Sequence, residues 1–506
     1  MSHFRTIRDP QPLLGRYTTC IDVQCLPKTF QDAIFVTRKL GLRYVWIDSL
    51  CILQDCADDW RAESSMMRYI YLYGALNIAA SAASSDHEGL SFPRNPHITR
   101  HIPISVTWDS PDLLAQKPRG AYYLFNGDIW DREVEFAPLN ARGWVLQERL
   151  LAPRILHFGR NQLYWQCNTI FHSEMFPRDL RTKNLGPYVP RVSSNFMRCF
   201  SGLKKRQRKS NMPKKEDDGP YARWSELANA YSATALTRGQ DKLIAVQALA
   251  ETMRDATGDA YVAGLWRSRI VDDVLWRTEV DALLPSPPPR SAAASCQNAA
   301  ITGRSQPWRA PTWSWASLDC QIEARSTWHY SAARGGDGDD DGKRLVRKMV
   351  PEVAGFNDVG TGQLRDARLR VEGLLYRNTQ PLSFRVLESP LSLYRAAEDT
   401  TPWSMKVVLD EWDAAFAGEN KYVIPTGALF FPVGSPIAGT VEGLLLEPVP
   451  RASGHFKRTA YFEVDLLLYG SDDILEEINV LEDAHDLGLA GCVDGKGRTL
   501  YPFTLL

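Results

Sequence analysis

The chain has 506 residues, of which 44% are apolar and 24% are charged, and its formal net charge at pH 7 is −1. These values are typical of a soluble globular protein, and the length predicts two or three domains. The near-zero charge excludes a general attraction to nucleic acid or anionic membranes. No apolar run is long enough for a membrane span, and the opening segment MSHFRTIRDPQPLLG lacks a secretory apolar core, so we expect a cytoplasmic protein.

The cysteine pattern argues against a disulfide framework and against a metal site. The nine cysteines are odd in number and scattered, which favours reduced thiols. Cys51 and Cys56 are separated by four residues and have no matching pair downstream, so we predict no zinc site.

The first predicted element is a helix that begins near Pro27 and ends at Gly41, after an irregular segment over residues 1–25. Its apolar residues recur at helical spacing. They are Phe30, Ala33, Ile34, Thr37 and Leu40.

A strand–helix–strand unit follows. Tyr44 to Asp48 is short and rich in aromatic and β-branched residues, which predicts a buried strand. Asp58 and Asp59 favour a helix from about Trp60 to Gly74, and the apolar run 76–80 predicts a second strand. We therefore expect the two strands to be adjacent and parallel, as in a βαβ unit.

Glu63 lies on the apolar face of the predicted helix, together with Trp60, Met67 and Tyr71. An ionised carboxylate on such a face is expensive unless it is paired or lies at the rim of a cleft. One interpretation is that Glu63 pairs with an arginine and is structural. The other is that Glu63 and Asp48 lie at a binding site at the carboxyl ends of the strands.

Further strands are predicted at 101–106 and 121–125, and then a helix that Pro153 ends. Arg142 lies just before this helix and Arg149 lies within it. Both are candidates to pair with Glu63 or Asp48, or to hold a phosphate. The segments ILHFG and QLYWQC predict a hairpin, in which we expect His157 to be packed and hydrogen-bonded rather than catalytic.

The composition divides the chain into domains and linkers. We predict that the first domain covers residues 26–175. After it we expect a linker with a basic run at 176–219, a helical region at 220–284, a Pro/Ala/Ser-rich linker at 285–308 and a β-rich domain at 309–506. The last of these contains an acidic loop at 334–343 and short strands separated by turns, which predict an antiparallel sheet.

Several segments resemble the heterokaryon incompatibility (HET) domain of filamentous fungi, and they occur in the family's order. They are WIDSLCILQD, DDWRAE, LNIAASAAS, RGWVLQERLLAPRILHFGRNQLYWQC, DKLIAV, YVAGLW and APTWSWASLD. HET domains normally open with a strand similar to Ala-Leu-Ser-Tyr-x-Trp-Gly. Nothing in residues 1–25 matches it, so we expect a start that is truncated, incorrectly assigned or divergent.

The resemblance implies a fold and a function. HET proteins trigger cell death on allorecognition, and the domain is distantly similar to TIR domains, many of which cleave NAD through a glutamate shortly after a tryptophan. An α/β domain with a parallel, TIR-like or flavodoxin-like sheet is therefore expected. Asp59-Trp60-x-x-Glu63 is similar to the TIR pattern, although one residue shorter than is common.

Three functional hypotheses follow. In the first, Glu63 stabilises the ribosyl centre of NAD, Asp48 orients it, and Trp60, Arg142 and Arg149 bind the dinucleotide, which is a substrate and not a cofactor. In the second, the domain is a non-enzymatic module that associates with itself or with an incompatibility partner. In the third, which rests only on fold analogy, the domain is a small-molecule transferase.

Overall fold

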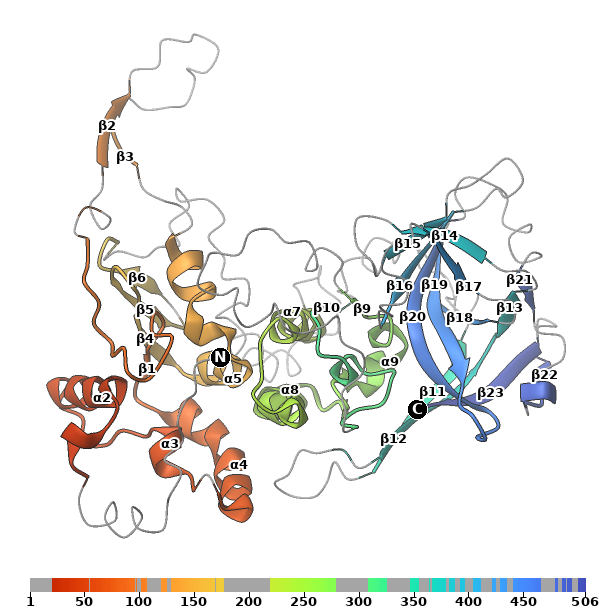
Figure 1. Cartoon of the computed structure of the whole chain (residues 1–506), viewed down its shortest axis with the longest axis horizontal. Helices are drawn as coiled ribbons and strands as arrows, with labels where there is room; N and C mark the ends of the chain where they lie inside the picture. The colour runs from red at the N-terminus through yellow and green to blue at the C-terminus, as the bar shows by residue number, and fades with distance from the viewer. Residues whose placement is uncertain are drawn as a thin grey trace, which may run out of the picture. The chain divides into compact units, whose positions relative to one another are not determined.

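The computed structural model divides the chain into two compact units, residues 1–198 and 199–506 (Figure 1). The structure describes residues 21–53, 55–95, 97, 102–106, 120–124, 129–168, 170–176, 219–278, 308–324, 346–354, 364, 366–378, 382–386, 392–395, 404–410, 421–424, 428–434, 440–465, 478–480, 485–487, 489–493 and 499–506. Each unit is described by itself.

Unit 1 contains several helices and a small four-stranded sheet. Its helices are η1 (Val23–Cys25), α2 (Lys28–Lys39), α3 (Asp48–Cys51), α4 (Ala57–Tyr73), η3 (Asp131–Glu135), η4 (Pro138–Ala141) and α5 (Gly143–Leu151). Its strands are β1 (Asn77–Ala79), β2 (Ile102–Val106), β3 (Gly120–Leu124), β4 (Arg154–Phe158), β5 (Leu163–Cys167) and β6 (Phe171–Ser173).

The sheet of unit 1 is only partly parallel. Its strand order is β1-β4-β5-β6, and β1 pairs with β4 in parallel while the other two pairings are antiparallel. The predicted hairpin of β4 and β5 is confirmed. The strands predicted at 101–106 and 121–125 are present as β2 and β3, which form a separate antiparallel pair. Ala79, Ala152 and Ile155 form one core cluster, and Trp130, Val134, Tyr164 and Phe171 form another.

The strand predicted at 44–48 is absent, so the prediction of a βαβ unit with 76–80 is wrong. The backbone of Ile47 is extended, at φ −131° and ψ 120°, but Asp48 already begins α3. Within the described residues, 42–47 belongs to no sheet, and Tyr44 is 82% exposed. Backbone N–H and C=O groups that have no neighbouring strand must form hydrogen bonds with water instead. An apolar sequence pattern does not show whether a neighbouring strand is present.

The predicted helices of unit 1 are confirmed, with small differences at their ends. Helix α2 ends where predicted, since Gly41 adopts the left-handed conformation at φ 71° and its N–H donates to the Arg38 carbonyl. The N-cap of α4 is Cys56 rather than Asp58 or Asp59, because its Sγ accepts the Asp59 N–H. The two aspartates instead occupy the first turn, where their charge favours the helix.

Unit 2 combines short helices with a large sheet. The helices are α7 (Pro220–Ser232), η5 (Gly239–Asp241), η6 (Ile244–Val246), α8 (Gln247–Thr257), η7 (Arg267–Arg269), α9 (Ile270–Asp273), η9 (Trp315–Ser317) and η12 (His485–Leu487). The short strands are β7 (Tyr261–Val262), β8 (Leu265–Trp266), β9 (Arg277–Thr278) and β10 (Ile322–Glu323).

The remaining strands form one thirteen-stranded sheet. They are β11 (Val346–Ala354), β12 (Asp366–Gly373), β13 (Tyr376–Asn378), β14 (Leu382–Val386), β15 (Ser392–Arg395), β16 (Ser404–Leu409), β17 (Lys421–Ile424), β18 (Leu429–Gly434), β19 (Thr440–Pro448), β20 (His455–Asp465), β21 (Ile478–Val480), β22 (Cys492–Val493) and β23 (Thr499–Leu505). Apart from β20 with β23, its pairings are antiparallel, as predicted.

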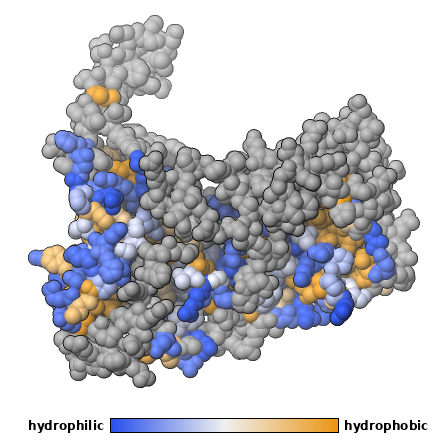
Figure 2. All heavy atoms as spheres, in the orientation of Figure 1, coloured by the Kyte–Doolittle hydropathy of each residue, from blue (hydrophilic) through white to orange (hydrophobic). Residues whose placement is uncertain are grey.

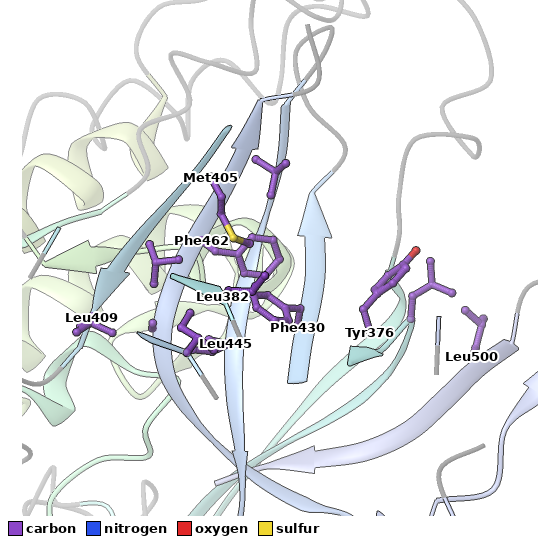
Figure 3. Packing of buried hydrophobic residues seen from close by; sticks show 13 residues of the cluster. Tyr376, Leu382, Met405, Leu409, Phe430, Leu445, Phe462 and Leu500 are labelled. Atoms are coloured by element: carbon purple, nitrogen blue, oxygen red, sulfur yellow. The ribbon is translucent and has the colours of Figure 1, made fainter. Parts of the chain in front are cut away.

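The core of this sheet is apolar and aromatic. Figure 3 shows Met405, Phe430 and Phe462 packed together, and the two phenylalanine rings meet edge to face at 5.4 Å. A buried ion pair joins the sheet to the segment after α9. Arg458 donates to Asp410 at 3.0 Å and to the Val274 carbonyl at 2.6 Å, and its guanidinium lies 3.5 Å from the centre of the Trp276 ring.

Some predictions fall outside the described residues. They are most of 176–219 with its basic run, most of 285–308, and the acidic loop at 334–343. Among the described helices, none is both long enough and apolar enough to span a membrane.

Candidate functional site

Three segments of unit 1 bring ionisable side chains together. Asp48 is the first residue of α3, Tyr71 lies near the end of α4, and Glu148 lies in α5. Arg142, the N-cap residue of α5, completes the group. The hydroxyl of Tyr71 forms a hydrogen bond with the Glu148 carboxyl group, and Asp48 and Arg142 both act electrostatically on these two side chains.

Local sequence explains how each element presents its side chain. The N–H of Ser49 donates to Asp48 Oδ1 at 2.7 Å, which holds the carboxylate at the start of α3. Asp59 Oδ2 accepts the Leu53 N–H at 2.7 Å and so fixes the connection into α4. Helix α5 ends at Leu151 because Pro153 keeps Ala152 extended.

Aromatic contacts hold the elements of the site in place. Trp46 meets Tyr71 edge to face at 5.8 Å, just before α3. Trp60 of α4 meets Trp144 of α5 in the same way at 6.3 Å. Such pairs contribute about 0.5–1.5 kcal/mol beyond their buried area, so they fix α4 and the preceding segment against α5.

The environment of Glu148 is unusual for a carboxyl group. Burial raises its pKa and the negative charge of Asp48 raises it further, whereas Arg142 and the Tyr71 hydrogen bond lower it, and the result is a pKa of about 7. Burial and the charges of Glu148 and Asp48 also raise the pKa of Tyr71 well above its usual value. At neutral pH, Glu148 can therefore either donate or accept a proton, whereas Tyr71 remains protonated.

Glu63 lies on α4 and is partly buried. Together with Asp48, it acts on Cys51, whose pKa is raised mainly by burial. Among the described residues, no hydrogen bond or ion pair involves the Glu63 side chain. Glu63 is not among the charges that shift the pKa of Glu148, whereas Asp48 acts on both Cys51 and Glu148 and so lies between the two acids electrostatically. Beside Asp48, the hydroxyl of Ser49 is buried without a hydrogen-bond partner in the described part of the chain.

Arg149 belongs to a different cluster. Its two terminal nitrogens donate to both oxygens of Glu135, at 2.8 and 2.6 Å, and Trp130 Nε1 donates to Glu135 Oε1 at 2.9 Å. Burial alone would raise the pKa of Glu135, but the charge and hydrogen bonds of Arg149 outweigh it and lower that pKa. Neither terminal nitrogen is left for a phosphate.

His157 is packed and hydrogen-bonded, as predicted. It is 1% exposed, with Nδ1 3.2 Å from Ser81 Oγ and Nε2 2.9 Å from Gln166 Oε1. Burial and the nearby positive charge of Arg149 lower its pKa to about 3, against smaller opposing effects of Gln166 and Glu135. A neutral, enclosed imidazole of this kind is structural.

Comparison with known proteins identifies the domain that contains these residues. Residues 9–148 match the family model described as Heterokaryon incompatibility protein (HET). This chain carries a HET domain. No curated protein and no solved structure matches the chain.

The HET match covers the whole candidate site, because it includes Asp48, Glu63, Tyr71 and Arg142 and ends at Glu148. Of the site residues predicted from sequence, the structure brings Asp48 and Arg142 together, places Trp60 against Trp144, and directs Arg149 toward Glu135. Glu148 and Tyr71 were absent from the predicted site. The available signal was Glu148 itself, an acid on a predicted helix next to Arg142 and Trp144.

Proposed function

We propose that this HET-domain protein acts in heterokaryon incompatibility, where it recognises non-self and triggers programmed cell death in the cytoplasm. The HET match over residues 9–148 supports the first part of this proposal. Cell death is the output that the family resemblance implies.

We further propose that the HET domain cleaves the bond between nicotinamide and ribose in NAD. The observation that carries this proposal is the convergence of Asp48, Tyr71, Arg142 and Glu148 from three separate segments. Cleavage of a glycosidic bond needs carboxylates beside the sugar, because positive charge develops on the ribosyl ring in the transition state. A cluster that contains two carboxyl groups and an arginine meets this requirement.

Four of the five site residues predicted from sequence have a role in this reaction. Glu63 stabilises the ribosyl centre, Asp48 orients the ribose, and Trp60 provides an aromatic surface for a ring of the dinucleotide. Arg142 is exposed and binds the pyrophosphate. We assign the pyrophosphate to Arg142 rather than Arg149, because Arg142 is exposed, whereas Arg149 is only 8% exposed and is paired with Glu135.

The test compares the wild type with Glu63→Gln, which keeps the side chain's shape and removes its charge. Loss of an electrostatic stabiliser typically lowers turnover about 10²–10³-fold, so NAD loss and cell death should both fall while the melting temperature is maintained. Asp58→Asn is the matched control, since Asp58 lies on the same helix and its carboxylate pairs on the surface with Arg61, its one ion-pair partner among the described residues. A folded Glu63→Gln variant that kills cells at the wild-type rate refutes a catalytic role.

A non-enzymatic association module is the second candidate, and exposed apolar residues favour it. Phe35 is 59% exposed, Tyr44 82% and Tyr73 76%. Figure 2 shows orange and tan residues among blue ones on the part of the surface that carries α2. If this module is the function, Tyr44→Ser with Tyr73→Ser should abolish self-association and killing, whereas Glu63→Gln should retain both.

A further inference from the structure

We infer that the outward face of α4 (Ala57–Tyr73) is the surface through which two copies of this chain pair, with the two helices antiparallel about a two-fold axis. The inference rests on the second function proposed above, self-association of the HET domain, and it does not depend on NAD cleavage.

Helix α4 has apolar side chains on two opposite sides. Its inner side packs within unit 1, where Met67 is 5% exposed and the ring of Trp60 meets that of Trp144. At 100° per residue, four further uncharged side chains fall within an arc of about 60° on the other side. These four residues, which we call the outer stripe, are Ala62, Met66, Tyr69 and Tyr73.

The outer stripe is exposed along its whole length. Ala62 is exposed, and Met66 is 48%, Tyr69 45% and Tyr73 76% exposed. The rings of Tyr69 and Tyr73 are stacked, with their centres 6.1 Å apart and their planes at 9°. This stack holds two large side chains in one arrangement before any partner binds, which lowers the entropy cost of binding. Contiguous apolar surface of this kind is typical of interaction sites.

The spacing of the outer stripe favours a second copy of the same helix as its partner. The four residues are separated by four, three and four positions, which is the spacing of a coiled-coil seam. This order is the same in both directions along the helix. A two-fold interface must be self-complementary, and a stripe with this symmetry meets that requirement when the helices are antiparallel.

The antiparallel arrangement also matches side chains by size and type. With the two-fold axis between Met66 and Tyr69, the Met66 thioether of each copy faces the Tyr69 ring of the other, which is a favourable sulfur–aromatic contact. Ala62 of each copy faces Tyr73 of the other, so the smallest side chain of the stripe meets an aromatic ring.

The charges beside the outer stripe do not oppose this pairing. Asp58 forms an ion pair with Arg61 on the same helix. The carboxylate of Asp59 accepts the Leu53 N–H at 2.7 Å. Closing the helix pair therefore leaves neither aspartate without a partner. Four side chains cover less than the roughly 800 Å² that each partner buries in a standard interface, so we expect a weak dimer that depends on concentration.

The test is the oligomeric state of the full chain, measured by sedimentation velocity over a range of concentrations. The wild type should pass from monomer to dimer as its concentration rises. Met66→Glu and Tyr69→Lys each place a charge opposite an uncharged residue, so each variant alone should raise the Kd about 10²-fold. Both positions are exposed in the monomer, so the melting temperature at low concentration should stay unchanged.

Mixing the two variants tests the antiparallel arrangement directly. In a mixed dimer, the introduced glutamate of one chain faces the introduced lysine of the other, while the second contact keeps the native methionine and tyrosine. Dimers should therefore reappear in the mixture. A parallel pair would place neither introduced charge opposite the other, so a mixture without recovery overturns the antiparallel pairing. Phe35→Ser is the matched control, because Phe35 is 59% exposed on α2, outside the outer stripe, and should retain wild-type association.

The outcomes separate this inference from the association function on which it rests. If the wild type dimerises and both α4 variants dimerise equally well, the outer stripe is not the interface, although self-association stands. A Phe35→Ser variant that is weakened as much as the α4 variants would also overturn the inference. If the wild type stays monomeric at every concentration, self-association itself fails. Loss of killing by Met66→Glu in that case would assign the outer stripe to a different protein and not to a second copy.

Discussion

Glu148 and Arg149 are neighbours on α5, yet they belong to two different kinds of polar cluster. Arg149 is paired with Glu135 through two hydrogen bonds, and Trp130, Gln166, His157 and Ser81 extend the network. Glu148 instead faces a second acid, Asp48. The first cluster balances its charges, whereas the second places two carboxyl groups close together.

This difference favours a structural role for the first cluster and supports the functional role that we propose for the second. A buried network with matched charges and hydrogen bonds maintains one arrangement of β4, β5 and η3. Two neighbouring carboxyl groups instead oppose each other's ionisation, an arrangement that is common at functional sites. Stability and activity should therefore respond in opposite ways to changes in the two clusters.

The largest expected effect on stability comes from breaking the balanced cluster. Arg149→Met leaves Glu135 buried without its partner, which should lower the free energy of unfolding by roughly 3–5 kcal/mol. Chemical denaturation of the full chain measures this, and Arg160→Met, at an exposed position, is the control. Adding Glu135→Gln to Arg149→Met should restore part of the loss, because the stranded charge is then gone. A change below about 1 kcal/mol in the single variant contradicts a structural role.

His157 should make the same cluster sensitive to acid. Its pKa falls from an ordinary value of 6.5 to about 3 on folding. The stabilising effect of the neutral imidazole is thus complete above pH 6.5 and is lost as pH falls toward 3. We expect a loss of roughly 2–4 kcal/mol across this range. Unfolding of His157→Gln measured over the same pH range should show a flatter profile, and parallel profiles would refute this assignment.

The unbalanced cluster should behave in the opposite way. Folding raises the pKa of Glu148 from 4.5 to about 7, so its ionisation destabilises the fold progressively as pH rises between these values. Glu148→Gln should therefore leave stability unchanged below pH 4.5 and increase it by about 1–2 kcal/mol above pH 7, after discounting for partial exposure. Thermal melts at pH 4 and pH 8 test this. A variant that is less stable at pH 8 would place Glu148 with the structural residues.

The sequence predicts most local elements but few of the contacts between them. The spacing of apolar residues together with Gly41 is enough to predict α2. The apolar runs on either side of Pro153 are enough to predict α5, β4 and β5, because these elements depend on residues that are close in the chain. The partner of β1 cannot be deduced in this way. The apolar run at 44–48 lies nearer in sequence, but β1 pairs with β4.

The candidate site shows the same division. Asp48 and Arg142 can be singled out because each lies at the end of a predicted element. Glu148 cannot, since its pKa depends on burial, on the charge of Asp48 a hundred residues earlier in the sequence, and on a hydrogen bond with Tyr71 of α4. Arg149 also has the right residue type for a phosphate, and only the three-dimensional contact with Glu135 shows that it is occupied.

The smallest expected effect tests the correction at 42–47 and its relation to the unbalanced cluster. Tyr44 is 82% exposed, so Tyr44→Ser should change the free energy of unfolding by less than about 0.5 kcal/mol. In a buried strand the same change would cost roughly 1.5–3 kcal/mol. Trp46→Leu is the informative partner, because Trp46 is partly buried against Tyr71. It should lower the free energy of unfolding by about 1–3 kcal/mol, because it removes the edge-to-face contact with Tyr71 and part of the buried surface. Equal and large losses of stability in both variants would instead restore the buried strand.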